Sequence, residues 1–276
     1  MSLLWRDQLR IVLCPDKVIV VRLGKGLRPQ IKEKLIWHCV PATTGMPWQS
    51  ALNTLNEKMV ELGKGANADV VIILSNHFVR YALLPWSEQL KGPEEEQALA
   101  RIYFEKIYGS LAATWALRIS EEGYGVARIA SAIDQMLLDG LSAVFASTPL
   151  HLASVQPYLM AAYNQWRYVL KDPNTCFVVA ETGKVCIAMI SDKNWWAVRS
   201  MQIHRNLKEE VLGLIEREML LAGLKPGKVF FYAPDEPGLI LPTSANMDTE
   251  PLKLPACVGF SPYTDAQFGM ALSGTA

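Results

Sequence analysis

Short apolar runs separated by turn signals open the chain. Residues 9–14 and 17–23 are rich in β-branched side chains, and Pro15-Asp16 lies between them. This pattern predicts a β-hairpin, because β-branched residues favour strands and Pro-Asp favours a tight turn. Residues 31–40 predict a third strand after the glycines at 24 and 26.

A helix and a buried strand follow this group of strands. Pro47 suits the first turn of a helix, and apolar residues then recur at helical spacing: Trp48, Ala51, Leu52, Leu55, Met59 and Leu62. Gly63 and Gly65 are expected to end that helix. Residues 69–75 are almost entirely apolar, which is typical of a strand buried on both faces.

Two more helices are predicted in the middle of the chain. The first begins at Pro93 with three glutamates that suit the positive end of a helix dipole. Its apolar stripe is expected at Leu99, Ile102, Tyr103 and Ile107. For the second helix, Ser131 and Asp134 have the spacing of a capping box, and the helix must stop before Pro149. Predicted strands lie at 78–84, 114–119, 125–130 and 150–155.

The last hundred residues repeat the order of the first seventy-five. Two strands, 175–180 and 184–191, flank the turn Glu181-Thr182-Gly183, and a third is predicted over 195–203. A helix over 207–222, capped by Asn206, and a strand over 228–233 follow. A short helix is expected between Asp265 and Leu272.

Three antiparallel strands followed by alternating helices and strands is the layout of a ribonuclease-H-like domain. Two such units in tandem form the actin, sugar-kinase and Hsp70 architecture, with a cleft between the halves. The predicted fold class is therefore α/β, with two ribonuclease-H-like subdomains over residues 1–155 and 156–276. Repetition of elements is a stronger sign of architecture than any single element.

Composition narrows the range of functions. Lysine plus arginine equals aspartate plus glutamate, so nothing in the overall charge attracts a nucleic acid. The five cysteines show no metal-ligand spacing, and the four histidines are scattered singly, so no metal site is expected. The first ten residues have no apolar signal segment. We expect a soluble protein of the cytoplasm.

Three segments resemble one family of assembly proteins. Ser75–Trp86 and Ser154–Leu159 resemble the cytoplasmic domain of the type II secretion protein GspL, and Gly269–Leu272 is similar to the ending of the pilus assembly protein PilM. The resemblance implies a cytoplasmic adaptor with an actin-like fold, peripheral to the inner membrane. Its implied partners are an inner-membrane pilus or secretion protein and an assembly ATPase.

The alternative is an ATP-binding protein or ATPase of the actin-like superfamily. Active members need an acid-x-glycine turn in each half and a glycine pair after a late strand, where backbone must approach the nucleotide closely. The first turn, Cys14-Pro15-Asp16, lacks glycine, and Ala233-Pro234-Asp235 lacks the pair. Only Glu181-Thr182-Gly183 keeps the form. These three residues are candidates for residual nucleotide binding, and we expect neither catalysis nor a cofactor.

A partner surface is predicted at the strand 78–84 and the residues that follow it. Phe78, Arg80, Ala82 and Leu84 should face one way, and Val79, Tyr81 and Leu83 the other. Trp86 follows Pro85, and buried tryptophan and arginine contribute strongly to interfaces. Phe78, Arg80 and Trp86 are therefore candidate partner contacts, although Trp86 could equally cover the edge of the core.

Overall fold

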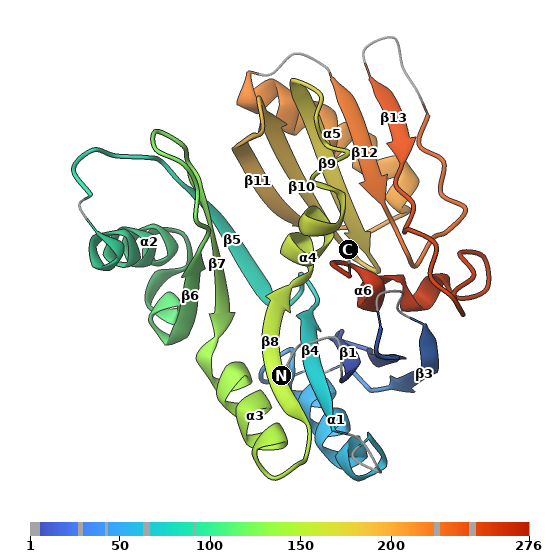
Figure 1. Ribbon diagram of the computed structural model, residues 1–276. Helices are drawn as coiled ribbons and strands as arrows, with labels where there is room; N and C mark the ends of the chain where they lie inside the picture. The colour runs from blue at the N-terminus through green and yellow to red at the C-terminus, as the bar shows by residue number, and fades with distance from the viewer. Residues whose placement is uncertain are drawn as a thin grey trace.

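The protein is described by a computed structural model that covers residues 6–26, 30–41, 44–62, 67–90, 92–223, 227–242 and 247–275. The predicted helix ends at Gly63 and Gly65 lie outside these residues. Figure 1 shows two large sheets, one in each half of the chain, and a smaller lobe at the side of the first.

The first sheet has five strands in the order β3-β2-β1-β4-β8. The two predicted hairpin strands are present, and the β1–β2–β3 pairs are antiparallel. β4 pairs in parallel with both β1 and β8, so it lies in the interior of the sheet. This position explains why all seven of its residues are buried. The strands are β1 (Asp7–Leu13), β2 (Lys17–Leu23), β3 (Ile31–His38), β4 (Ala68–Leu74) and β8 (His151–Pro157).

The second sheet repeats this arrangement, in the order β11-β10-β9-β12-β13. Its first three strands are antiparallel, and β12 pairs in parallel with β9 and β13. The predicted duplication is confirmed, but β13 was not predicted. The strands are β9 (Asn174–Glu181), β10 (Lys184–Ser191), β11 (Asn194–Gln202), β12 (Lys228–Tyr232) and β13 (Asp248–Pro251).

A three-stranded sheet is inserted between β4 and β8. Its order is β5-β7-β6, with β5 (Val79–Leu84), β6 (Trp115–Ile119) and β7 (Arg128–Asp134), and α2 (Pro93–Tyr108) packs on it. β7 begins three residues later than the predicted strand at 125. A short 3-10 segment, Gly109–Thr114, joins α2 to β6.

The predicted apolar stripe of α2 is wrong for two of its four residues, since Leu99 and Tyr103 are half-buried but Ile102 and Ile107 are exposed. The helix buries Ala100 and Phe104, whereas Ile102 and Ile107 are each 60% exposed. Three strands offer only a narrow surface, and small side chains on β7 let the Phe104 ring approach closely. Ile102 and Ile107 consequently face solvent.

The helices α1 (Gln49–Leu62) and α3 (Gln135–Ala146) pack together on the first sheet, and all six predicted core residues of 48–62 are buried. The capping-box prediction is wrong. Ser131 lies within β7, and Asp134 itself caps α3 by accepting a hydrogen bond from the Met136 amide. In the second half, α5 (Leu207–Ala222) is capped by Asn206 and ends at left-handed Gly223, as predicted.

The chain crosses between the halves through β8 and α4 (Tyr158–Trp166). The predicted division after residue 155 falls inside β8 and stays a prediction. The C-terminal α6 (Gly269–Leu272) returns to the first half, where it contacts β1 and β2. There the buried Arg10 guanidinium donates to the carbonyls of Ala271 and Ser273. The chain thus passes between the halves through β8 and α4 and returns through α6.

Two further features bear on earlier expectations. All five cysteines lie in the described part and remain thiols. Within the same part, no helix is long and apolar enough to cross a membrane.

Candidate functional site

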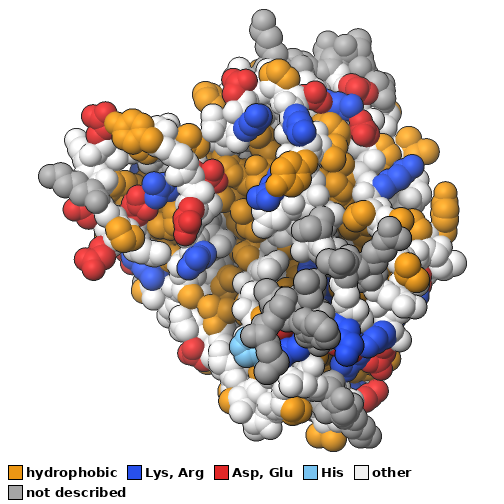
Figure 2. Space-filling view, in the orientation of Figure 1, with side chains coloured by type: hydrophobic (Ala, Val, Ile, Leu, Met, Phe, Trp, Pro, Cys, Tyr) orange, Lys and Arg blue, Asp and Glu red, His pale blue; other side chains and the backbone are white. Residues whose placement is uncertain are grey.

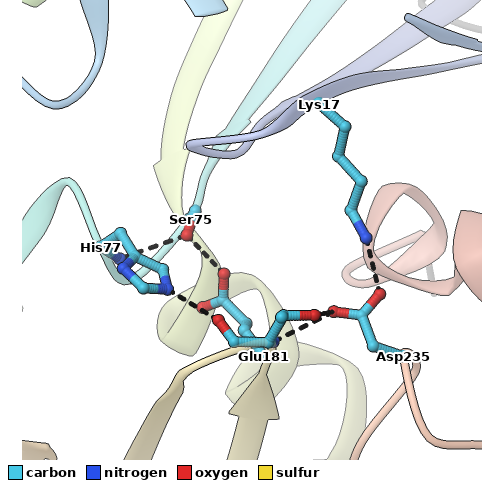
Figure 3. A network of polar contacts seen from close by, with 6 residues as sticks. Lys17, Ser75, His77, Glu181 and Asp235 are labelled. Atoms are coloured by element: carbon cyan, nitrogen blue, oxygen red, sulfur yellow. Dashed lines mark hydrogen bonds and ion pairs between the residues drawn. The ribbon is translucent and has the colours of Figure 1, made fainter. Parts of the chain in front are cut away.

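Four loops meet where the two sheets approach each other (Figure 3). They are the β1–β2 turn, the loop after β4, the β9–β10 turn and the loop after β12. In the predicted architecture the first, third and fourth of these would surround a nucleotide. Each of the four carries a polar side chain or backbone group that contacts another loop.

Glu181, the last residue of β9, reaches into the first half. Its Oε1 accepts a hydrogen bond from the Asn76 amide at 2.9 Å, and its Oε2 accepts one from the Ser75 hydroxyl. The residue is 6% exposed. Burial raises the pKa of Glu181 to about 7, against the opposing effect of the hydrogen bonds from Ser75 and Asn76. The carboxyl group is therefore held by donors of the opposite half.

Asp235, in the loop after β12, joins two of the other loops. Its Oδ1 lies 2.8 Å from Lys17 Nζ, and its Oδ2 accepts from the Thr182 amide at 3.2 Å and from the Thr182 hydroxyl at 2.9 Å. Burial alone would raise the pKa of Asp235, but Lys17 and Thr182 outweigh it and the pKa is lowered. The aspartate is thus stabilised in its ionised form.

His77 and Asn76 complete the contacts. His77 Nε2 lies 3.0 Å from the Thr182 carbonyl oxygen, and burial lowers the pKa of His77. Asn76 Oδ1 accepts from the Tyr81 hydroxyl at 2.7 Å and from the Leu159 amide at 3.2 Å. The loop after β4 is therefore fixed from both halves of the molecule. We call Lys17, Ser75, Asn76, His77, Glu181, Thr182 and Asp235 the polar clasp.

Within the polar clasp, the side chains and amides that could bind a nucleotide already bind other protein groups. Both carboxylates accept from protein donors, and the Thr182 amide and hydroxyl donate to Asp235. Gly183 has φ of +73°, so the turn itself requires glycine. The predicted candidates Glu181, Thr182 and Gly183 do lie together at the cleft. Their role in nucleotide binding stays a prediction.

Sequence reasoning missed the partners of these candidates. Lys17, Ser75 and Asn76 lie 105 to 218 positions from the groups they contact in the second half, and local patterns do not reveal contacts over such separations.

 Lys17 and Asp235 are 218 positions apart, and Ser75 and Glu181 are 106 apart. Periodicity describes neighbours along the chain, so it holds no information on such pairs. The one available signal was that Asp235 follows a strand whose carboxyl end faces the cleft.

The predicted partner contacts have different surroundings. Phe78 is 5% exposed and packs in the main core, because it precedes β5 and does not follow the alternation of that strand. Little of its surface is open to a partner, and its role as a partner contact stays a prediction. The expected faces of β5 are otherwise present, with Ala82 and Leu84 against α2. Arg80 is half-buried and donates to the carbonyls of His77 and Val79 at 3.0 and 3.1 Å.

Trp86 is half-buried at the edge of the α2 lobe. Its ring meets Tyr124 edge-on, with centroids 4.7 Å apart. Both rings line a cavity of about 580 Å³ that also includes Leu84, Leu99 and Arg128. The tryptophan therefore contacts the protein and also borders open space, so both interpretations of Trp86 stay open.

A second hollow separates the β6–β7 part of the lobe from β8 and α4. Its volume is about 420 Å³, and its walls include Ile119, Ile129, Val155 and Met160. Figure 2 shows hydrophobic side chains gathered in the hollow between the α2 lobe and the rest of the molecule. β8 is the outer strand of the first sheet here, so its free edge borders the groove.

Comparison with known proteins places the fold. No protein-family model and no curated protein matches the chain. Among solved structures, it is similar to a PilM–PilN type IV pilus biogenesis complex, with a TM-score of 0.66, 16% identity and 96% of each chain covered. It is also similar to the cytoplasmic domain of EpsL, an inner-membrane component of the Vibrio cholerae type II secretion system. That match has a TM-score of 0.62 and 8% identity, and covers 98% of this chain and 96% of the other.

A third similar structure is a Bacteroides thetaiotaomicron protein of unknown function with an actin-like ATPase fold. Its TM-score is 0.58 at 10% identity, with 83% of this chain and 82% of that chain covered. The resemblance found in the sequence is thus confirmed at the level of structure. The chain has an actin-like ATPase fold, and its structural neighbours include the pilus protein PilM and the secretion protein EpsL.

Proposed function

We propose that the chain is a non-catalytic adaptor in the inner-membrane assembly platform of a type IV pilus or a type II secretion system. The observation that carries the proposal is the polar clasp. Its loops occupy the positions of nucleotide-binding loops but bind one another, with Asp235 held by Lys17 and Thr182. The similar folds of PilM and EpsL support the choice of system.

The proposed partners are an inner-membrane pilus or secretion protein and an assembly ATPase. Through the former, the chain would be held at the cytoplasmic side of the inner membrane. The groove beside β8 suits an extended segment of the membrane partner. An outer strand offers unpaired backbone groups, and the apolar walls near Val155 and Met160 can take alternate side chains.

The first experiment tests partner binding. The purified chain is used to capture the inner-membrane pilus or secretion proteins encoded near its gene. Met160→Glu places a charge in the apolar wall of the groove and should weaken capture at least tenfold. Ile240→Glu is the matched control, since Ile240 is 74% exposed and lies in the second half. Equal capture by both variants would remove the groove from the proposal.

The second experiment tests the absence of catalysis. A ligand that binds only the folded state raises the melting temperature. Magnesium-ATP should therefore leave the melting temperature unchanged, and no phosphate release should be detected. ATP turnover that disappears in Glu181→Ala would contradict the adaptor function and favour an ATPase.

A further inference from the structure

Two cationic side chains, one from each half, adjoin residues of the polar clasp: Arg80 donates to the His77 carbonyl, and Lys184 follows the turn that contains Thr182. Arg80 lies on β5 of the first half, and Lys184 begins β10 of the second. β5 contacts β11, the strand on which Gln202 pairs with Lys184. Only β11 therefore lies between the strands that carry the two cations. The His77 ring lies 3.0 Å from the Thr182 carbonyl oxygen, two residues before Lys184.

Neither cation has a carboxylate partner in the part of the chain that the structure describes. Arg80 donates from Nη1 to two backbone carbonyls only. The Lys184 ammonium makes no hydrogen bond or ion pair within those residues, although the side chain is half-buried. Lys17, at the other end of the polar clasp, is mostly buried but has Asp235 at 2.8 Å. A partly buried ammonium beside another cation is unfavourable, and a bound anion would remove that cost.

The other charged groups nearby do not neutralise the pair. Burial lowers the pKa of Lys184, Arg80 lowers it further, and the more distant Glu181 only partly opposes them. The Glu181 carboxyl is itself held by Ser75 and Asn76. His77 carries no charge at neutral pH, since burial lowers its pKa, and Asp16 faces it from the β1–β2 turn.

We propose that Arg80 and Lys184 form a binding site for an oxyanion, either a phosphate or a carboxylate group. A guanidinium presents parallel N–H donors that match two oxygens, and an ammonium adds a compact positive charge. Because one cation comes from each half, the bound anion bridges the cleft next to the polar clasp. The inference concerns residues outside the clasp and does not depend on the proposed function.

The experiment follows thermal unfolding in sodium phosphate, with ionic strength held constant by sodium chloride. Phosphate at ten times its dissociation constant should raise the melting temperature by about 3 °C or more. Lys184→Met should abolish this rise. In chloride alone the same variant should melt no lower than the unsubstituted protein, because the substitution removes one of two neighbouring positive charges. Lys208→Met, an exposed lysine on α5, is the control and should retain the rise.

A second pair of variants separates charge from folding. Arg80→Lys should keep part of the phosphate effect, and Arg80→Met should lose it. A parallel titration with triglutamate tells a carboxylate source from a phosphate source. If neither anion stabilises the protein more than it stabilises Lys184→Met, the site does not exist. Stabilisation by magnesium-ATP that needs Glu181 would overturn the adaptor function but leave this oxyanion site untouched.

Discussion

Two opposing effects act on the pKa of the Glu181 carboxyl group. It is a buried carboxyl group, yet it lies between two halves of a protein and accepts hydrogen bonds from both Ser75 and Asn76. The hydrogen bonds favour the ionised form, whereas burial favours the protonated form, and burial has the larger effect. The contact between the halves should therefore respond to pH near neutrality.

Stability should fall with rising pH because of this one group. The pKa of Glu181 is about 7 in the folded state and 4.5 as its ordinary value, so the folded protein binds the proton more tightly. The stability from this group is fully present below about pH 4.5 and is lost as pH rises through 7. The loss amounts to at most about 3 kcal/mol.

Glu181→Gln should remove this dependence, because an amide keeps a donor for Ser75 and an acceptor for Asn76 without a charge. Urea unfolding at pH 5.5 and pH 8 is the measurement. From pH 5.5 to pH 8, the free energy of unfolding of the variant should rise relative to that of the unsubstituted protein by about 1–3 kcal/mol. Glu216→Gln, an exposed glutamate on α5, should show no such gain. If the free energy of unfolding changes equally with pH in all three proteins, ionisation of Glu181 does not destabilise the folded state.

The Lys17–Asp235 pair should be worth more than a surface ion pair. Both side chains are mostly buried, with 13% and 17% exposure, and Asp235 is also held by Thr182. A double-mutant cycle with Lys17→Met and Asp235→Asn should give a coupling of about 1 kcal/mol or more. The exposed pair Lys58–Glu61 serves as comparison and should give about 0.3 kcal/mol. Equal couplings would show that the cleft is as open to water as the surface.

The bounds of a helix or strand were predictable where the residues along it favour a single conformation. The strand 17–23 was placed at both ends, since β-branched residues fill it and Pro15 and Gly24 border it. The buried face of α2 was not predicted correctly, because the helix has apolar residues on several sides. The face that becomes buried depends on the small sheet beneath it. The cap of α3 failed similarly, since Ser131 has the right spacing but β7 continues through it.

The packing of α2 gives a direct test of that correction. Phe104 is fully buried and its ring lies 6.3 Å from that of Trp115, whereas Ile102 is 60% exposed. Phe104→Ala should lower the free energy of unfolding by about 3–5 kcal/mol. Ile102→Ala should change it by less than about 0.5 kcal/mol. Urea unfolding monitored by tryptophan fluorescence compares them. A larger loss for Ile102→Ala would restore the predicted stripe.

At the scale of the whole molecule, duplication was visible in the sequence and the joining of the halves was not. The order of strands and helices repeats, so two similar sheets could be expected. The polar clasp could not, because Glu181 and Asp235 act on residues that only the folded chain brings near. The return of α6 to the first sheet also depends on such a contact, between Arg10 and the carbonyls of Ala271 and Ser273.

Gly269 lies where α6 touches both halves. Its backbone is ordinary right-handed helix, with φ of −59°, so the conformation does not require glycine. Space does, because a Cβ there would overlap the Tyr232 hydroxyl and approach Pro234 Cβ to 3.3 Å. The Tyr232 ring is buried against Trp166, with centroids 4.6 Å apart, and so cannot move aside easily.

Gly269→Ala should therefore push α6 away from either β12 or β1, at a cost of about 1–3 kcal/mol. Gly213→Ala is the matched substitution. Gly213 lies within α5, where an added Cβ meets nothing within 4 Å, so alanine should stabilise the helix by about 0.5–1 kcal/mol. Urea unfolding gives both values, and hydrogen exchange of the β1 and β12 amides locates the change. If both substitutions raise the free energy of unfolding, the Tyr232 side chain moves aside for the new methyl group. In that case α6 does not hold the halves together.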